Sequence, residues 1–296
     1  MKSFITYYFV KTILKFFSFF PLPINHAIGK LIGLCLYAFN SKARQISDIN
    51  IRTCMPELSL DQQQKLVKNS LIELGKTISE LGPVWLWKTD KIFAHLQVEG
   101  KEIVQSAINE NKGVILITPH IGCWEMAGLY VGKQWSCLNL YHPPKIISLE
   151  HFILHARGRT GAKIVATQKK GLAILLKSLR SGQVTGILPD QTPKDRNSGT
   201  FAPFFGRPAL TINLVSSLVK KTGAEVFMCY VKRLPEGQGY ILRFQETQTG
   251  IDSPDNLISA TALNQSVEQL IEQAPEQYLW SYKRFKQVAE GLQEIY

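Results

Sequence analysis

The stretch that decides the fold runs from residue 114 to residue 125 and reads VILITPHIGCWE. It opens with a short apolar run rich in β-branched residues, which predicts a buried strand. Pro119 ends this strand because proline has no N–H to give to a sheet, and His120 is thereby placed at the strand's carboxyl end. Gly122 permits a tight turn into a helix that begins near Trp124. The stretch therefore predicts a strand-turn-helix unit with a histidine at its junction.

The same alternation continues on both sides of this unit. Helical patterns cover Glu125–Gln134, Gly171–Arg180 and Leu210–Lys221, and short apolar runs between them predict further strands. These runs are Lys163–Thr167, Val184–Leu188, Val226–Val231 and Tyr240–Phe244. Alternation of this kind is typical of an α/β fold with a mostly parallel central sheet flanked by helices. Ligands of such folds bind beyond the carboxyl ends of the strands.

An amphipathic helix is expected upstream, between Ser59 and Leu81. Its apolar residues recur at intervals of three and four, and Ser59 with Gln62 resembles a capping box. Gly82 and Pro83 are expected to stop it.

The N-terminal segment is rich in aromatic and aliphatic residues from Phe4 to Phe39. Lysines, prolines and a histidine interrupt it before any run reaches the ~20 apolar residues that a spanning helix needs. Two shorter helices that lie in one leaflet or dip into it fit this pattern. A signal peptide after Lys2 and a buried helical hairpin are the alternatives. We expect residues 1–40 to form a membrane-associating helical segment and residues 41–296 to form the catalytic domain.

The chain has 296 residues and a formal net charge of +11, which predicts an acidic partner: nucleic acid, anionic lipid or an acidic carrier protein. Its basic residues occur in scattered pairs, whereas a long basic arm would favour nucleic acid. The five cysteines are scattered and never form a CxxC pair. This arrangement indicates neither a disulfide framework nor a structural zinc site, and it favours a reducing, cytoplasm-facing location.

His120 and Glu125 are the candidate catalytic pair. A histidine held by a carboxylate is what general-base catalysis on an alcohol requires, because the carboxylate fixes the tautomer and stabilises the imidazolium. On one regular helix the two side chains would diverge by roughly 140°, but a turn between them lets them meet. By spacing alone, a histidine and a glutamate at this interval are more often a surface pair, but the position at a strand end favours the catalytic interpretation. Cys123 is either a nucleophile beside His120 or a small buried hydrophobe.

Other chemistries lack their characteristic residues. The chain contains no GxSxG elbow for a serine hydrolase. His151 and His155 have helical metal-ligand spacing but lack the HExxH order, and no glycine-rich phosphate loop is present. We therefore expect no metal and no cofactor.

The block TPHIGCWE resembles the HxxxxD/E signature of the lipid A biosynthesis acyltransferases, in the HxxxxE form of the late (lauroyl/myristoyl) class, within the lysophospholipid acyltransferase superfamily. Further blocks resemble this family in the same order, over nearly the whole chain: Arg44–Ser59, His155–Val165, Ile187–Thr211 and Pro275–Lys286. One departure is that the family often has a histidine before its C-terminal basic pair, where this chain has Tyr282. The aromatic and basic residues of this last block suit either a headgroup contact or simple packing.

The resemblance implies transfer of a fatty acyl chain from an acyl thioester, usually acyl carrier protein, to a hydroxyl of an acidic glycolipid. That acceptor would be a lipid A precursor in lipopolysaccharide or lipooligosaccharide biosynthesis, at the cytoplasmic face of the inner membrane. His120 would be the base and Glu125 its orienting partner.

Arg157 occupies the family's internal arginine position, and Asp190 its acidic position before Gln191. Arg157 would bind a phosphate or an oxyanion through its planar donor fork. Alternatively, Arg157 forms a surface salt bridge and Arg159 is the functional arginine. Asp190 follows a strand and should point into the site, unless it anchors Arg157 or caps the next turn.

Two other functions remain open from the sequence. The acceptor could be a lysophospholipid or another glycolipid. A non-catalytic basic protein that binds membranes or nucleic acid is the alternative from another class, and strongly salt-dependent DNA binding would favour it. It leaves the ordered sequence blocks unexplained, so we expect no nucleic-acid partner.

Overall fold

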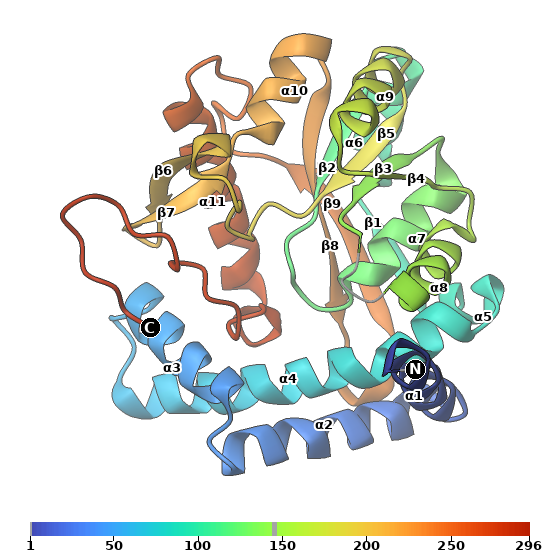
Figure 1. The fold of residues 1–296 in the computed structure, drawn as a ribbon, viewed down its shortest axis with the longest axis vertical. Coiled ribbons are helices and arrows are strands. Elements are labelled where there is room, and N and C mark those ends of the chain that lie inside the picture. The colour runs from blue at the N-terminus through green and yellow to red at the C-terminus, as the bar shows by residue number, and fades with distance from the viewer. Residues whose placement is uncertain (1, 144–146) are drawn as a thin grey trace.

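The computed structural model describes residues 2–143 and 147–296. Its centre is a five-stranded sheet in the order β1-β9-β8-β2-β5 (Figure 1). These strands are β1 (Leu96–Glu99), β2 (Val114–Ile117), β5 (Val184–Ile187), β8 (Glu225–Arg233) and β9 (Tyr240–Glu246). Neighbouring strands run parallel except β8 and β9. The expected α/β fold with a mostly parallel, helix-flanked sheet is confirmed.

Strand β2 is buried on both faces, which explains its uninterrupted apolar sequence. Ile115 and Ile117 contribute to one hydrophobic core, and Val114 and Leu116 contribute to the other. The first core includes residues of α9 (Lys169–Arg180), α10 (Leu214–Thr222) and α11 (Asn256–Gln273). The second includes residues of α6 (Lys101–Asn109) and α7 (Trp124–Gln134).

Two small sheets flank the central one. Strands β3 (Leu138–Tyr141) and β4 (Lys163–Ala166) form a parallel pair beside β5, and α8 (Ile147–Gly158) lies between them in the chain. Strands β6 (Gly199–Phe204) and β7 (Arg207–Ile212) form an antiparallel hairpin. The helix that we expected from Leu210 therefore begins at Leu214. Residues 210–212 pair instead with the adjacent strand β6, and this hairpin overrides the helical pattern of the sequence.

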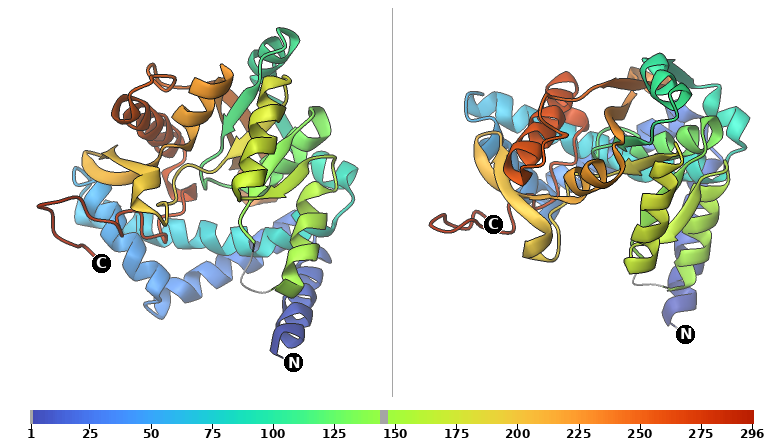
Figure 2. Two further views of the ribbon diagram at one scale, coloured as in Figure 1. Left: turned by 45° about the horizontal axis from the view of Figure 1, so that its top comes forward. Right: turned by 90° about the horizontal axis from the view of Figure 1, so that it is seen from above.

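The N-terminal third is helical and lies across one end of the sheet (Figure 2). It contains α1 (Lys2–Ser18), α2 (Leu22–Ala38), α3 (Lys42–Cys54), α4 (Leu60–Leu86) and α5 (Thr89–Phe93). Helices α1 and α2 both pack on α4. At the α2–α4 crossing, a Cβ on Gly75 would lie 2.1 Å from the carbonyl oxygen of Gly29, so these backbones approach too closely for a side chain.

Among the described residues, no single helix has both the length and the apolar composition to cross a bilayer. Helices α2 and α3 meet those two criteria only as a pair, and a bend of 81° separates them.

Helix α4 begins as expected and ends later than expected. The Ser59 hydroxyl accepts from the Gln62 N–H, and the Gln62 side chain accepts from the Ser59 N–H, which completes the capping box. Pro83 does not stop the helix. Proline cannot donate to the carbonyl four residues earlier, that of Ser79, and this oxygen instead accepts from the Asn25 side chain at 3.2 Å. Helix α2 thus satisfies the group that Pro83 leaves free.

A buried charged cluster joins α2, α4 and the sheet. The Arg233 guanidinium donates to Glu80 at 2.9 Å and to Glu73, and Tyr240 and His26 also contact Glu80. Burial alone would raise the pKa of Glu80, but the Arg233 charge and hydrogen bonds outweigh burial and lower this pKa to about 2. Glu80 is therefore an anion, and it binds Arg233, Tyr240 and His26 in the interior.

Candidate active site

His120 and Asp190 meet at the carboxyl edge of the sheet. Strands β2 and β5 are parallel neighbours, with Ile117 paired to Ile187. His120 and Asp190 are each the third residue after this pair, so the chain delivers both side chains to the same place. Nδ1 of His120 donates to Oδ1 of Asp190 at 2.7 Å, and the His120 backbone N–H donates to Oδ2 at 2.9 Å. One carboxylate therefore holds both the ring and the backbone of His120.

This arrangement fixes the chemistry that the ring can perform. Burial would raise the pKa of Asp190, but the His120 charge and hydrogen bonds outweigh burial and lower it, so Asp190 is an anion. An anion at Nδ1 keeps the proton on that nitrogen and leaves the lone pair of Nε2 available. The side-chain nitrogen of Gln191 lies 3.4 Å from Nε2. The ring is arranged to accept a proton through Nε2.

The turn after His120 is held by contacts with β8 and with the segment 277–279. Gly122 has φ +58°, and a Cβ there would lie 2.0 Å from the carbonyl oxygen of Val231. Its N–H donates to the carbonyl of Gln277, while the Leu279 N–H donates to the carbonyl of His120. The expected glycine turn is confirmed, and a side chain at Gly122 would displace the catalytic loop.

Glu125 does not pair with His120 as we expected. Its carboxylate accepts two bonds from Arg157, with Nε at 2.9 Å and Nη2 at 2.5 Å, and a third from the Trp85 indole at 3.2 Å. The turn directs the His120 ring toward the end of β5, whereas Glu125 lies in the first turn of α7 and pairs with α8. The carboxylate partner of His120 is Asp190 instead.

Arg157 and Arg159 have different surroundings. Burial would lower the pKa of Arg157, but the Glu125 carboxylate outweighs burial and raises it, so Arg157 is a cation with a half-exposed side chain. Arg159 donates to the backbone carbonyls of Val84 and Trp87. It thereby satisfies oxygens that the end of α4 leaves without helical partners. A substrate-binding role for Arg159, which we gave as an alternative, stays a prediction.

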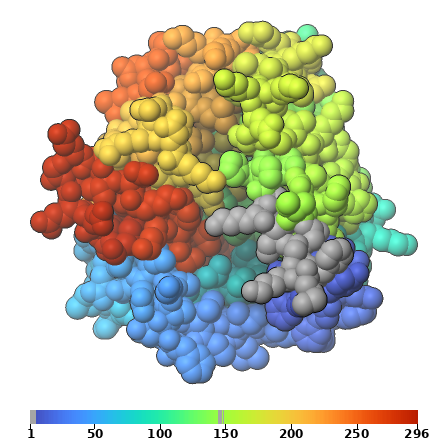
Figure 3. All heavy atoms as spheres, viewed as in Figure 1, coloured from blue at the N-terminus to red at the C-terminus, as the bar shows by residue number. Residues whose placement is uncertain are grey.

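An apolar pocket begins beside His120. Thr118 and Trp124 line it, and the Trp124 ring lies edge-on to the His120 ring at a centroid distance of 5.0 Å. Glu125 and Arg157 contribute its charged lining. Its other walls come from α7, β3, β4 and β5, and its volume is about 110 Å³. The apolar lining residues include Leu129, Leu140, Ile164, Ile187 and Leu188. In Figure 3 the surface is hollowed between the green segments and the red C-terminal segment.

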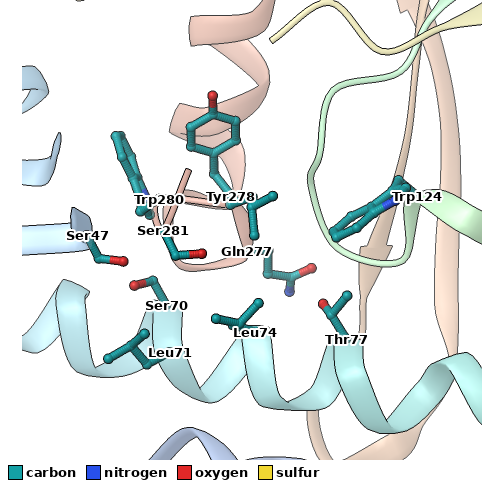
Figure 4. A pocket seen from close by; sticks show the side chains of 11 residues that line it. Ser47, Ser70, Leu71, Leu74, Thr77, Trp124, Gln277, Tyr278, Trp280 and Ser281 are labelled. Carbon is teal, nitrogen blue, oxygen red and sulfur yellow. The ribbon is translucent and has the colours of Figure 1, made fainter. Parts of the chain in front are cut away.

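A second cavity lies on the other side of Trp124. Figure 4 shows it between α4 and the segment 277–281. Its volume is about 10 Å³, close to the least that a single water needs, so it cannot hold a substrate. The Ser47 hydroxyl lines it, is buried and has no hydrogen-bond partner among the described residues. This cavity suits one buried water.

Cys123 and the C-terminal block are structural. Cys123 is 2% exposed and burial raises its pKa well above the ordinary value, so it is the small buried hydrophobe and not a nucleophile.

In the C-terminal block, Trp280, Arg284 and Phe285 are also buried. Arg284 donates to the Leu210 carbonyl at 2.8 Å, which ties the C-terminal segment to β7. Packing is thus the correct alternative for these three residues, while Lys283 and Lys286 remain exposed.

Asp190 was expected in the site from the sequence, but its pairing with His120 was not. A signal was present. His120 and Asp190 each follow a buried apolar run by the same number of residues. Where two such runs are parallel neighbouring strands in register, residues at equal distances after them lie side by side at the edge of the sheet. The edge-on contact of Trp124 with His120 and the hydrogen bond from Trp85 to Glu125 had no sequence signal.

Comparison with known proteins identifies the family of this chain. The family model described as bacterial lipid A biosynthesis acyltransferase matches residues 1–287. The chain is similar to two proteins of Escherichia coli (strain K12), a lipid A biosynthesis palmitoleoyltransferase and a lauroyltransferase. It is 27% identical to each over 277 residues, which cover 93% of this chain and 89% and 90% of theirs. A lipid A biosynthesis myristoyltransferase of the same organism is 23% identical over 267 residues, 89% of this chain and 80% of the relative. The chain therefore belongs to the bacterial lipid A biosynthesis acyltransferase family and is an acyltransferase.

Proposed function

We propose that this enzyme transfers a fatty acyl chain from an acyl thioester to a hydroxyl of a lipid A precursor, with His120 as the general base. The observation that carries the proposal is the His120 ring, held through Nδ1 by Asp190 beside an apolar pocket. A hydroxyl is nearly un-ionised at neutral pH, and a positioned base typically supplies ~10²–10⁴ in rate.

The reaction needs one proton to move twice. Nε2 of His120 takes the proton of the acceptor hydroxyl as its oxygen attacks the thioester carbonyl, and a C–O bond forms. The tetrahedral intermediate then collapses, the C–S bond breaks, and the imidazolium returns the proton to the departing thiolate sulfur. The Asp190 anion stabilises the imidazolium between these two transfers.

Glu125 and Arg157 act as a unit in this proposal. Glu125 fixes the guanidinium through two hydrogen bonds, and the other N–H donors of Arg157, for which the described residues show no partner, can bind an anion. That anion is the thioester oxyanion or a phosphate of the substrates. Glu125 thus serves catalysis by positioning Arg157, and both residues belong to the active site.

The proposed partners are acidic. The net charge of +11 attracts an acidic glycolipid acceptor, an acyl carrier protein that delivers the thioester, and an anionic membrane surface. Large apolar side chains on α1 and α2 and directly after them are exposed and suit a membrane interface: Ile5, Tyr8, Phe9, Phe16, Phe19, Ile24, Leu31 and Phe39. We place the enzyme at the cytoplasmic face of the inner membrane, anchored through this segment.

The test is acyl transfer by the purified full chain. Acyl carrier protein and coenzyme A thioesters are offered with a lipid A precursor, a lysophospholipid or another glycolipid, and products are identified by mass spectrometry. We expect transfer to the lipid A precursor, and at least ~10²-fold less with His120→Ala at an unchanged melting temperature. Undiminished turnover by this variant would refute His120 as the base, and transfer only to another lipid would refute the acceptor.

A further inference from the structure

Two glycines line the apolar pocket. Gly128 lies in the middle of α7, and Gly186 lies in β5. Glycine is unfavourable within regular helices and strands, because it loses more backbone entropy on folding than any other residue and has no side chain to pack. A glycine at such a position calls for a reason in its surroundings.

Close packing supplies that reason at Gly132, one turn further along α7. A Cβ on Gly132 would lie 2.8 Å from the Cβ of Ala162 and 3.0 Å from Oγ1 of Thr160. Gly128 differs, since among the described residues a Cβ there would meet no heavy atom within 4 Å, apart from its two chain neighbours and the backbone of its own helix. Protein packing therefore explains Gly132 and leaves Gly128 unexplained.

Gly186 also leaves space on its side of the pocket. A Cβ there would meet only Oδ1 of Asn139, at an ordinary contact distance of 3.5 Å. The same oxygen accepts from the Gly186 N–H at 2.8 Å, which holds β3 beside β5. The two walls thus face the pocket without side chains at these positions, although a side chain would fit at either.

Gly128 lies one turn of α7 beyond Trp124 and Glu125, which contact His120 and Arg157 respectively. Gly128 is the fourth residue after Trp124 and the third after Glu125, so on a helix it shares their face one turn away, ~5 Å along the axis. Gly186 directly precedes Ile187, whose partner in the β2 register is Ile117. A chain that begins at the thioester beside His120 and enters the pocket would pass this pair of glycines.

We propose that the acyl chain of the donor runs between Gly128 and Gly186, and that the absent side chain at position 128 sets the longest chain the enzyme accepts. This inference rests on the proposed function. The ligand class is a saturated or unsaturated fatty acyl group, because the aliphatic side chains of Leu129, Leu140 and Ile164 line the pocket with Ile187 and Leu188. Leucine at position 128 would fill the space through which the distal methylenes pass.

The experiment compares chain lengths in one assay. Wild type, Gly128→Ala and Gly128→Leu are given acyl carrier protein thioesters from decanoyl to palmitoyl, and kcat/KM is measured for each. A single methylene in an apolar pocket changes discrimination by about 10–200-fold. We expect Gly128→Leu to lose at least about 100-fold on the longest chain that wild type uses while retaining the shorter ones, and Gly128→Ala to give a smaller shift in the same direction.

Two controls separate occupancy of the pocket from damage to the helix. Lys133→Leu adds the same side chain at an exposed position of α7 and should leave the chain-length profile unchanged. Gly128→Ala should raise the melting temperature, because alanine favours the helix and meets no clash, whereas Gly132→Ala should lower it.

An active Gly128→Leu enzyme with the wild-type chain-length profile, or with an equal loss of kcat/KM on every chain length, would overturn this inference alone. A wild-type enzyme that consumes no thioester would overturn the proposed function and this inference together.

Discussion

Replacing Asp190 with asparagine removes the charge at His120 and keeps the shape of the side chain. In the protein, two carboxylate oxygens accept from Nδ1 at 2.7 Å and from the backbone N–H at 2.9 Å. An asparagine has one oxygen for these two donors. If that oxygen accepts from the backbone, the amide group faces Nδ1 as a donor, and the ring proton must move to Nε2, where it blocks the base. The same change in a Ser-His-Asp triad lowers kcat by ~10⁴, and we expect a loss of ~10³–10⁴ here.

The assay is steady-state acyl transfer, with Glu125→Gln as the matched comparison. Both variants exchange one carboxylate for an amide, but Glu125 contacts Arg157 and not His120. We expect Asp190→Asn to lower kcat with little change in KM, and Glu125→Gln to lower kcat less. Circular dichroism and the melting temperature serve as controls for folding. The reasoning is refuted if Asp190→Asn stays within about tenfold of wild type while Glu125→Gln loses ~10³ or more.

Two further predictions concern arginines that the structure separates by role. Arg157→Ala should abolish turnover with little change in melting temperature. Arg159→Ala should lower the free energy of unfolding by about 1.5–3 kcal/mol, because it leaves carbonyls at the end of α4 unpaired. Equal effects of the two variants on thermal unfolding would contradict this assignment of roles. Arg233→Met should cost about 3–5 kcal/mol at pH 7, since it strands the Glu80 anion in the interior. The lowered pKa of Glu80 stabilises wild type above the unfolded value of 4.5, and this contribution is lost as pH falls toward about 2. The difference in free energy of unfolding between wild type and Arg233→Met, measured in urea, should therefore become smaller in acid. A difference that does not change with pH would contradict the stabilisation of Glu80 by Arg233.

Local sequence determined much of the site. The strand before Pro119, the turn at Gly122 and the helix after it all follow from neighbouring residues, and the structure has them in place. The capping box at Ser59 is equally local. Such features are readable because each depends on backbone chemistry within a few positions.

Features that depend on distant pairing were not readable. The partner of His120 is set by the register between β2 and β5, and Pro83 is tolerated because Asn25 of another helix reaches the Ser79 carbonyl. The β6–β7 hairpin similarly takes residues that look helical by themselves. In the first two cases a contact between residues far apart in sequence, and in the hairpin a pairing with the preceding strand, decided between structures that the local pattern allowed.

The central claim is that Asp190 keeps the His120 proton on Nδ1, so that Nε2 is the base. A long-range ¹H–¹⁵N NMR spectrum of the histidine rings measures this directly, with the His120 signals assigned by their loss in His120→Ala. The account predicts a protonated Nδ1 and an unprotonated Nε2 for neutral His120 in wild type, with the pattern reversed in Asp190→Asn. A protonated Nε2 in the neutral wild-type ring, or the same pattern in both proteins, would contradict it.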